Sequence, residues 1–260
     1  MRLGVLKSVN ALPVTLGLEC GAVPFPGELL SGEPSWLNQQ ARAGRLDLTA
    51  VSAAEVAAAP GTYRILPGFC VASRGPVQSV RLFSRVPLED LPGRPVAITS
   101  ASATSRILVQ VLLAGIQPVP LLGEPHLDER VPAVLLIGDR ALGEVTGARH
   151  VVDLGALWAQ TTGLPMVFAL WVTTRAELAP EGLDLLERSR AWGQAHRRRV
   201  LQEASQRTGL SCRRLEDYFS GLHHRLDAEC VAGLREFYRR AGHLGLLPPG
   251  GEGLLEEVAA

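Results

Sequence analysis

Four polar residues lie where apolar runs give way to turns or helices, which is where ligand-binding side chains gather in α/β proteins. Asn10 follows the first apolar run in KSVNALP, and Ser52 follows LDLTAV. Ser79 lies in RGPVQSVRLFS, and Asp139 ends the run LLIGD. Amides and hydroxyls suit a small polar ligand, and a carboxylate can act as a general base. The candidate catalytic residues are therefore Asn10, Ser79 and Asp139, and Ser52 joins Asn10 and Ser79 as a candidate for binding.

The segment TSASATS, residues 99–105, joins a predicted strand to a predicted helix. A helix N-terminus leaves backbone N–H groups unpaired and carries a partial positive charge. Hydroxyls added there suit a carboxylate or a phosphate without any lysine. We therefore expect an anion site built from Ser100, Ser102, Ala103, Thr104 and Ser105. The alternative is plain capping of the helix by Ser102 or Thr104.

Each of the other candidates also has a purely structural alternative. Asn10 would form a turn before Pro13, and Asp139, which follows Gly138, would cap a helix. Ser79 lies in an alternating pattern that predicts a strand, where it would normally face outward. It enters a binding site only if that strand crosses a cleft.

The elements around these residues alternate between short apolar runs and helical patterns, which is typical of βαβ units. In the first unit, strands are predicted at residues 2–6 and 46–51, and helices at 13–20 and 34–43. In the second unit, strands are predicted at residues 96–99 and 133–137, and a helix at 104–114. From residue 176 onward only helices are predicted, over 178–204 and 227–241.

Two α/β units can form either one long sheet or two lobes. Extended segments at residues 77–84 and 166–174 flank the second unit and would carry the chain between two lobes. We therefore predict an α/β, two-lobed clamp in which residues 1–83 and 175–260 form one lobe and residues 84–174 the other. Ligands of open α/β sheets bind where strands end and helices begin, so we expect the site in the central cleft.

The composition argues against several classes of protein. The 26 basic and 26 acidic residues cancel, so nothing indicates a nucleic-acid partner. No apolar run reaches the roughly 18 residues of a membrane span, and no cleavage site follows the N-terminal run, so we expect a cytoplasmic protein. The 4 cysteines form no CxxC pair, and the glycine motifs of nucleotide cofactors are missing. We therefore expect no metal and no organic cofactor.

A series of blocks in order resembles the menaquinone-biosynthesis family that includes chorismate dehydratase. The blocks are SVNALP, EPSWLNQQARAGRLDLTAVSAAE, YRILPGFCVASRGPVQSVRLFSR, AITSASATSRILVQVLL, AVLLIGDRAL and VVDLGALWAQTTGLPMVFALW, within residues 1–175. The resemblance implies a fold similar to that of type II periplasmic binding proteins, in agreement with the two-lobed prediction. It also implies that chorismate, a small dianion, becomes 3-[(1-carboxyvinyl)oxy]benzoate and water in the futalosine route, without a cofactor.

The reaction implied by the resemblance removes a ring proton and then the 4-hydroxyl, and the ring becomes aromatic. The protein must hold two carboxylates and stabilise developing charge. One carboxylate fits the hydroxyls and N–H groups of residues 102–105, and the rest of the substrate fits Asn10, Ser52 and Ser79. Asp139 would repel a dianion. We therefore expect the enolpyruvyl carboxylate of the substrate itself to take the proton.

Two other functions share this scaffold. A sister enzyme, 1,4-dihydroxy-6-naphthoate synthase, is expected to use a histidine and a loop like SPCPND, whereas this chain has KSVNALP and no histidine in a matched block. A non-catalytic protein that binds small anions would work outside the cytoplasm, and no signal peptide or lipidation cysteine is found here. The dehydratase is therefore favoured over both, and the sequence leaves the oligomeric state open.

Overall fold

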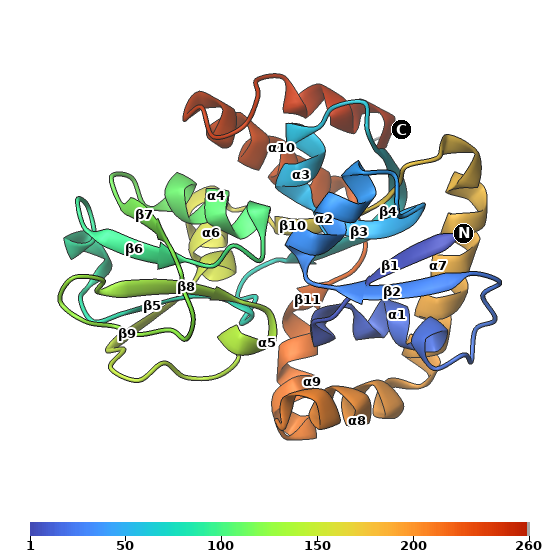
Figure 1. Cartoon of the computed structure of the whole chain (residues 1–260), viewed down its shortest axis with the longest axis horizontal. Helices are drawn as coiled ribbons and strands as arrows, with labels where there is room; N and C mark the ends of the chain where they lie inside the picture. The colour runs from blue at the N-terminus through green and yellow to red at the C-terminus, as the bar shows by residue number, and fades with distance from the viewer. Residues whose placement is uncertain (259–260) are drawn as a thin grey trace.

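The first of two sheets has six strands, in the order β11-β4-β10-β3-β1-β2, in a computed structural model that describes residues 1–258 (Figure 1). Its strands are β1 (Arg2–Leu6), β2 (Glu28–Gly32), β3 (Leu48–Ser52), β4 (Arg64–Ser73), β10 (Met166–Thr173) and β11 (Leu222–His223). β1 pairs in parallel with β2 and β3, whereas β10 runs antiparallel to β3 and β4. The strand predicted at residues 2–6 is confirmed.

The second sheet has five strands, in the order β7-β6-β8-β5-β9. Its strands are β5 (Val80–Ser84), β6 (Pro95–Ile98), β7 (Gln117–Pro120), β8 (Ala133–Ile137) and β9 (His150–Asp153). β6 runs parallel to β7 and β8, whereas β5 runs antiparallel to β8 and β9. Figure 1 shows this sheet beside the first, and the two-lobed α/β fold is confirmed.

The two crossing segments do not follow the predicted boundaries at residues 83/84 and 174/175. β5 lies wholly in the second sheet, although the sequence predicts that residues up to 83 belong to the first lobe. β10 lies in the first sheet, although the sequence predicts that residues up to 174 belong to the second lobe. An apolar run fits either sheet equally well, and only long-range pairing decides between them. The chain therefore crosses in the turns before β5 and before β10.

Helices cover the first sheet on both faces, with α3 and α10 on one side and α1, α8 and α9 on the other (Figure 1). The α-helices are α1 (Leu12–Glu19), α2 (Pro34–Arg42), α3 (Ala53–Ala58), α4 (Ala103–Leu112), α5 (Gly138–Ala141), α6 (Leu154–Thr162), α7 (Ala179–Ala195), α8 (Arg197–Thr208), α9 (Cys212–Gly221) and α10 (Ala228–His243). Short 3₁₀ helices are η1 (Val9–Ala11), η2 (Leu88–Asp90), η3 (Ala176–Leu178) and η4 (Gly251–Val258). Because both faces are covered, β10 is buried at every position.

The C-terminal region is divided more finely than the sequence predicts. The helix predicted over residues 178–204 breaks at His196, where φ is −116° and ψ is 36°, and so becomes α7 and α8. Apolar spacing does not reveal this break because both halves keep the helical period. α9 is a further helix between the two predicted ones. Among the described residues, no helix is long and apolar enough to cross a membrane.

The two lobes share an apolar core where α4 and α6 approach α10 and β10. Trp158 of α6 is fully buried and packs edge-on against Phe237 of α10, with ring centroids 6.3 Å apart. Its indole N–H donates to the carbonyl of Pro165 at 3.1 Å. On α4, the buried Thr104 hydroxyl donates to the carbonyl of Phe168 and accepts from the N–H of Ala54. We call the contacts made by Trp158 and Thr104 the packed joint.

Candidate active site

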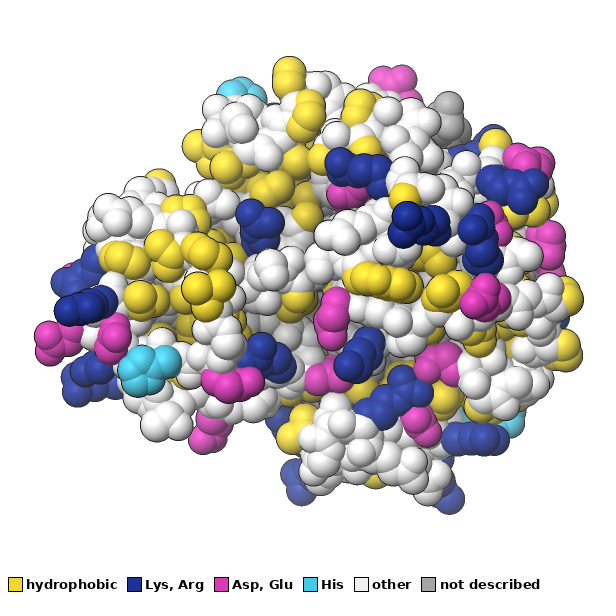
Figure 2. All heavy atoms as spheres, in the orientation of Figure 1, with side chains coloured by type: hydrophobic (Ala, Val, Ile, Leu, Met, Phe, Trp, Pro, Cys, Tyr) yellow, Lys and Arg dark blue, Asp and Glu magenta, His cyan; other side chains and the backbone are white. Residues whose placement is uncertain are grey.

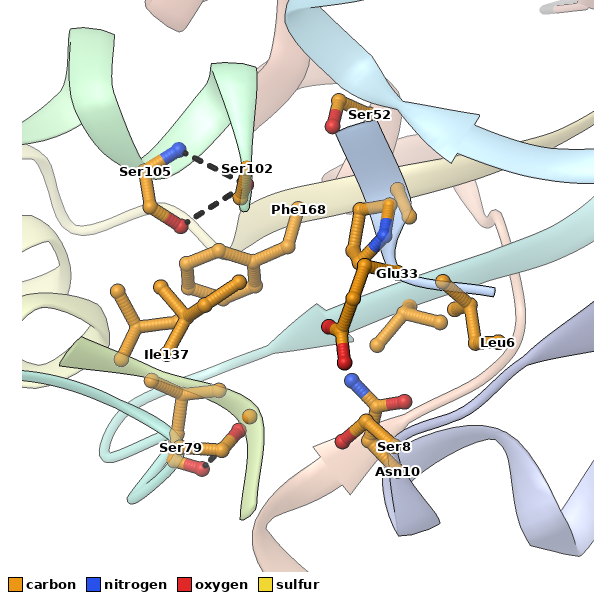
Figure 3. A pocket seen from close by; sticks show the side chains of 16 residues that line it. Leu6, Ser8, Asn10, Glu33, Ser52, Ser79, Ser102, Ser105, Ile137 and Phe168 are labelled. Carbon is orange, nitrogen blue, oxygen red and sulfur yellow. Dashed lines mark hydrogen bonds between the residues drawn. The ribbon is translucent and has the colours of Figure 1, made fainter. Parts of the chain in front are cut away.

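A cavity of about 50 Å³ lies between the two lobes (Figure 3). This volume is smaller than that of most small-molecule sites, so admitting such a ligand requires the lobes to move apart. Its polar lining comes from the ends of β1, β2 and β3, from the turn before β5 and from the start of α4. These polar residues are Ser8, Asn10, Glu33, Ser52, Ser79, Ser102 and Ser105. Apolar side chains, Phe168 and Ile137 among them, complete the wall. Strand ends and a helix start thus meet at one hollow, as the two-lobed prediction requires.

Asn10 lies in η1, directly after β1, and its side chain lines the cavity. His224 Nε2 donates to the backbone carbonyl of Asn10 at 2.7 Å and so fixes this turn. Burial lowers the pKa of His224, which favours its neutral ring. The side-chain Oδ1 of Asn10 is buried and has no hydrogen-bond partner within residues 1–258. Because buried polar atoms are nearly always paired, this oxygen is available to a ligand.

Ser52 ends β3 and precedes α3. Its backbone N–H donates to Asn38 Oδ1 at 3.0 Å, so the residue is held firmly. Its Oγ is buried, lines the cavity and lacks a partner in the described part of the chain. Ser52 is therefore a second buried oxygen left available at the same hollow.

The start of α4 faces the cavity through Ser102 and Ser105, both of which are buried. Ser102 Oγ accepts from the N–H of Ser105 at 3.3 Å and from its hydroxyl at 3.2 Å (Figure 3). Ser102 is therefore the N-cap of the helix, as one of the two sequence interpretations holds. The helix still directs its positive end toward the hollow, so capping leaves the anion interpretation open.

Three other members of the predicted anion site do not line this cavity. The Thr104 hydroxyl is used entirely in the packed joint, between Phe168 and Ala54. Ser100 is exposed and borders hollows outside the cavity, and Ala103 borders one of these. These three residues therefore do not line the cavity, because only one face of a helix start can point inward, and their predicted part in anion binding stays a prediction.

Ser79 lines the cavity from the turn before β5, not from within a strand as predicted. The carboxylate of Asp153 holds this turn by accepting from the N–H groups of Val77 at 3.0 Å and Gln78 at 2.5 Å. Gln78 has a positive φ of 58°, which turns the chain so that Ser79 faces inward. The buried hydroxyl of Tyr218 lies beside Ser79, and burial raises its pKa far above the usual value.

Asp139 does not cap a helix and does not line the inner cavity. Its Oδ1 accepts from the hydroxyl of Ser8 at 2.8 Å and from the N–H of Val9 at 3.1 Å, across the gap between the lobes. Gly138, with φ of 60°, makes the turn that directs Asp139 toward Ser8. The cap interpretation of Asp139 is therefore wrong, since the carboxylate joins the lobes instead.

Charged residues border a wider hollow just outside the cavity, and they include Lys7, Glu33, Asp139 and Arg140. The N–H of Ser35 donates to the carbonyl of Ala101 there at 3.0 Å, which is a further hydrogen bond between the lobes. We call the contacts of Asp139 and Ser35 across this opening the polar rim. Figure 2 shows charged side chains of both signs on the two lobes beside the cleft.

Glu33, Ser8 and His224 are site residues that the sequence analysis missed. Glu33 is the one carboxylate that lines the inner cavity within the described chain, and Figure 3 shows it pointing toward the side chain of Asn10. It follows β2 directly, so the rule that selects residues at strand ends would have found it. His224 leaves no such signal, because it reaches Asn10 only through the tertiary fold.

Comparison with known proteins places this geometry in context. The profile of a family described as menaquinone biosynthesis matches residues 1–243. A chorismate dehydratase of Thermus thermophilus is 33% identical over 236 residues, which are 82% of this chain and 86% of the relative. A 1,4-dihydroxy-6-naphthoate synthase of the same organism is 31% identical over 218 residues, 75% of each chain.

Solved structures are similar in fold. Protein AF1704 from Archaeoglobus fulgidus has a TM-score of 0.79 at 21% identity, over 95% of this chain and 98% of its own. The alkanesulfonate-binding protein SsuA from Xanthomonas axonopodis, bound to MOPS, has a TM-score of 0.64 at 14% identity, over 95% and 94%. The fold is therefore that of periplasmic binding proteins.

Proposed function

The chain belongs to the menaquinone-biosynthesis family, and from this premise we propose that it is a carbon–oxygen lyase that dehydrates chorismate in the cytoplasm. The products are 3-[(1-carboxyvinyl)oxy]benzoate and water. One observation carries the proposal: Asn10 Oδ1 and Ser52 Oγ are buried at one cavity without partners in the described chain. Such atoms are satisfied when a polar substrate fills the hollow.

The start of α4 binds one of the two substrate carboxylates. The Ser102 and Ser105 hydroxyls lie at the positive end of this helix and face the cavity. Lys7 and Arg140 border the outer opening and attract a dianion toward it. Neither cation lines the inner cavity, so hydroxyls and helix N–H groups provide the close contacts there.

Asn10 and Ser79 act on the reacting ring from the opposite wall. Loss of the proton at ring carbon 3 pushes charge onto the ring carboxylate, and the 4-hydroxyl then leaves as the ring becomes aromatic. Asn10 supplies an amide N–H₂, and Ser79 supplies a hydroxyl once it gives up its 3.3 Å bond to the carbonyl of Val77; both stabilise this developing charge without being ionised. His224 holds the backbone of Asn10, and the turn that Asp153 fixes holds the backbone of Ser79.

The enolpyruvyl carboxylate of the substrate takes the ring proton in this proposal. Asp139 is poorly placed for that role, because its Oδ1 already accepts two hydrogen bonds at the polar rim. Glu33 is the carboxylate that lines the cavity and is therefore the competing base. Asp139→Asn and Glu33→Gln separate the three possibilities. If either variant binds chorismate normally but no longer turns it over, that residue is the base and the substrate is not.

Incubation of the purified protein with chorismate alone tests the function. We expect loss of one water and the absorbance of an aromatic enol ether without any added cofactor. Asn10→Ala removes a donor at the site of developing charge, so kcat should fall by about 10²–10³-fold. Ser31→Ala on the exposed face of β2 is the matched control and should leave kcat unchanged. Tight binding without turnover by the wild type would overturn the dehydratase and indicate a binding protein.

The sister reaction is the second candidate, because the naphthoate synthase is 31% identical over 75% of this chain. Its substrate is a cyclised futalosine derivative, which the same assay can offer beside chorismate. His224 is the histidine nearest to Asn10, but its Nε2 is used on a backbone carbonyl. The dehydratase is therefore preferred, and turnover of the futalosine derivative alone would reverse that choice.

A further inference from the structure

A second cluster of reactive side chains lies where β11 runs into α10. His223, Asp227 and Cys230 each offer one donor atom, and these three atoms all lie within 4.8 Å of one another. None of the three lines the cavity between the lobes. The cluster therefore plays no direct part in the chemistry proposed above.

A second thiol adjoins this cluster. Cys70 lies on β4, next to β11, and its Sγ contacts the carbonyl of His223 at 3.8 Å. Cys70 and Cys230 are both fully buried, and each is a free cysteine. The neighbouring Cys230 and burial raise the pKa of the Cys70 thiol well above its usual value. Two thiols, an imidazole and a carboxylate are thus brought together from three elements.

The donors are already oriented by the fold. Asp227 is the N-cap of α10, and its Oδ1 accepts from the N–H of Cys230 at 2.9 Å. Its Oδ2 accepts from His223 Nε2 at 2.9 Å, so these two donor atoms face each other. The bond to Oδ1 is of the kind that holds a ligating carboxylate in position in known sites, because it leaves Oδ2 for the ion.

An ion can reach the cluster from solvent. The side chains of His223 and Asp227 are each 28% exposed, whereas Cys230 closes the inner side. Arg74 also donates to Asp227 Oδ2, at 2.7 Å, and it contacts Glu229 as well. Because Glu229 offers Arg74 another partner, Asp227 Oδ2 can be released to an ion while Arg74 stays paired.

We propose that His223, Asp227 and Cys230 form a binding site for one divalent transition-metal ion, with zinc as the best fit. Sulfur, imidazole nitrogen and carboxylate oxygen are the donors that zinc takes in proteins. Binding replaces the His223–Asp227 hydrogen bond and releases the thiol proton of Cys230 to solvent. A water completes the tetrahedron as the fourth ligand.

The proposed metal site is connected to the cavity between the lobes through one residue, His224. His224 directly follows His223 and donates to the backbone carbonyl of Asn10 at 2.7 Å. An ion that fixes His223 therefore also fixes His224 and the turn that presents Asn10.

Cobalt(II) titration of the tag-free, metal-stripped protein under reducing conditions tests the site. Thiolate ligation gives a charge-transfer band in the near ultraviolet, which zinc should then displace. We expect one equivalent of cobalt bound with this band in the wild type. Cys230→Ser should abolish the band and weaken binding at least tenfold. Cys212→Ser, which changes an exposed cysteine of α9, is the matched control and should behave as the wild type.

Three results would overturn the proposal: no band in the wild type, a band that persists in Cys230→Ser, or a band lost in Cys212→Ser. His223→Gln guards against a folding defect, because this side chain is partly exposed. It should retain a thiolate band while binding cobalt at least tenfold more weakly, and unchanged affinity would also refute the site. Cys70→Ser should keep the band, because Cys70 is not among the three donors.

Discussion

The two lobes meet in two unlike ways, at the packed joint and at the polar rim. The joint buries Trp158 completely against Phe237 and fully satisfies the Thr104 hydroxyl. The rim consists of hydrogen bonds around Asp139 and Ser35 beside an open hollow. The first contact excludes water, whereas the second replaces bonds that water would otherwise make.

This difference assigns separate tasks to the two contacts. A buried aromatic side chain contributes several kcal/mol, whereas a hydrogen bond that water can replace contributes only about 1 kcal/mol. We therefore infer that the joint keeps the lobes together while the rim opens to admit substrate. Changes at the joint should lower stability and leave substrate affinity alone, and changes at the rim should do the reverse.

Trp158→Ala gives the largest expected effect. The variant removes the most deeply buried large side chain of the joint, so the free energy of unfolding should fall by about 3–5 kcal/mol. Chemical denaturation followed by fluorescence measures this loss. Trp36→Ala is the matched control, because Trp36 is 36% exposed, and its loss should stay well below that value. Equal losses in the two variants would break the comparison.

Thr104→Val tests the polar part of the joint. Valine matches threonine in shape but leaves the carbonyl of Phe168 and the N–H of Ala54 buried without their partner. We expect unfolding to become easier by about 2 kcal/mol, with KM for chorismate unchanged. The control Thr161→Val alters an exposed hydroxyl that bonds only within its own helix. A rise in KM with no loss of stability would return Thr104 to the binding site.

Much of this architecture is predictable from local pattern, because the apolar runs and helix starts are local features. The strand at residues 2–6 and the serines at the start of α4 lie where the sequence indicates. Which of the two sheets β5 joins, and which β10 joins, is not predictable in this way, since it depends on pairing between distant segments. The predicted boundaries fail at these two strands for that reason.

The candidate site residues also fall into two groups: those that local sequence pattern places correctly and those whose partners depend on the tertiary fold. Asn10, Ser52 and Ser79 follow from their places beside strands, and all three line the cavity. Thr104 and Asp139 occupy equally suggestive places, yet their partners are Phe168 and Ser8, which lie on the other lobe. Sequence finds residues at the junctions, but only the packing of the lobes decides which of them face the substrate.

Asp139→Ala probes the rim and should give a smaller effect than either joint variant. Loss of the bonds to Ser8 and Val9 favours the open form, so KM should rise about tenfold, which is roughly 1.4 kcal/mol. Stability in denaturant should change little, because water replaces both bonds. Asp139→Asn keeps an oxygen acceptor and should raise KM less. A large loss of stability in Asp139→Ala would show that the rim also holds the lobes together.

The smallest expected effect is a pH dependence of stability that comes from His224, a half-buried residue that bonds the backbone carbonyl of Asn10. Burial lowers its pKa, and His223 and Arg190 lower it further, while the bond to the Asn10 carbonyl opposes the shift. A depressed pKa means that the unfolded chain binds the proton more readily than the folded chain. The stability from the neutral ring is therefore complete above the unfolded pKa of about 6.5 and is lost as the pH falls toward the folded value.

Thermal melting of the wild type and of His224→Gln from about pH 8 to about pH 5 isolates the contribution of His224 to stability. Glutamine keeps an N–H donor for the Asn10 carbonyl but does not titrate, so the variant should lose less stability below about pH 6.5 than the wild type. His196→Gln changes an exposed histidine and should follow the wild-type curve. Parallel curves for His224→Gln and the wild type would mean that His224 is hydrated like the residues of the rim. If the stability of His224→Gln instead depends less on pH than that of the wild type, the turn that presents Asn10 excludes water as the packed joint does.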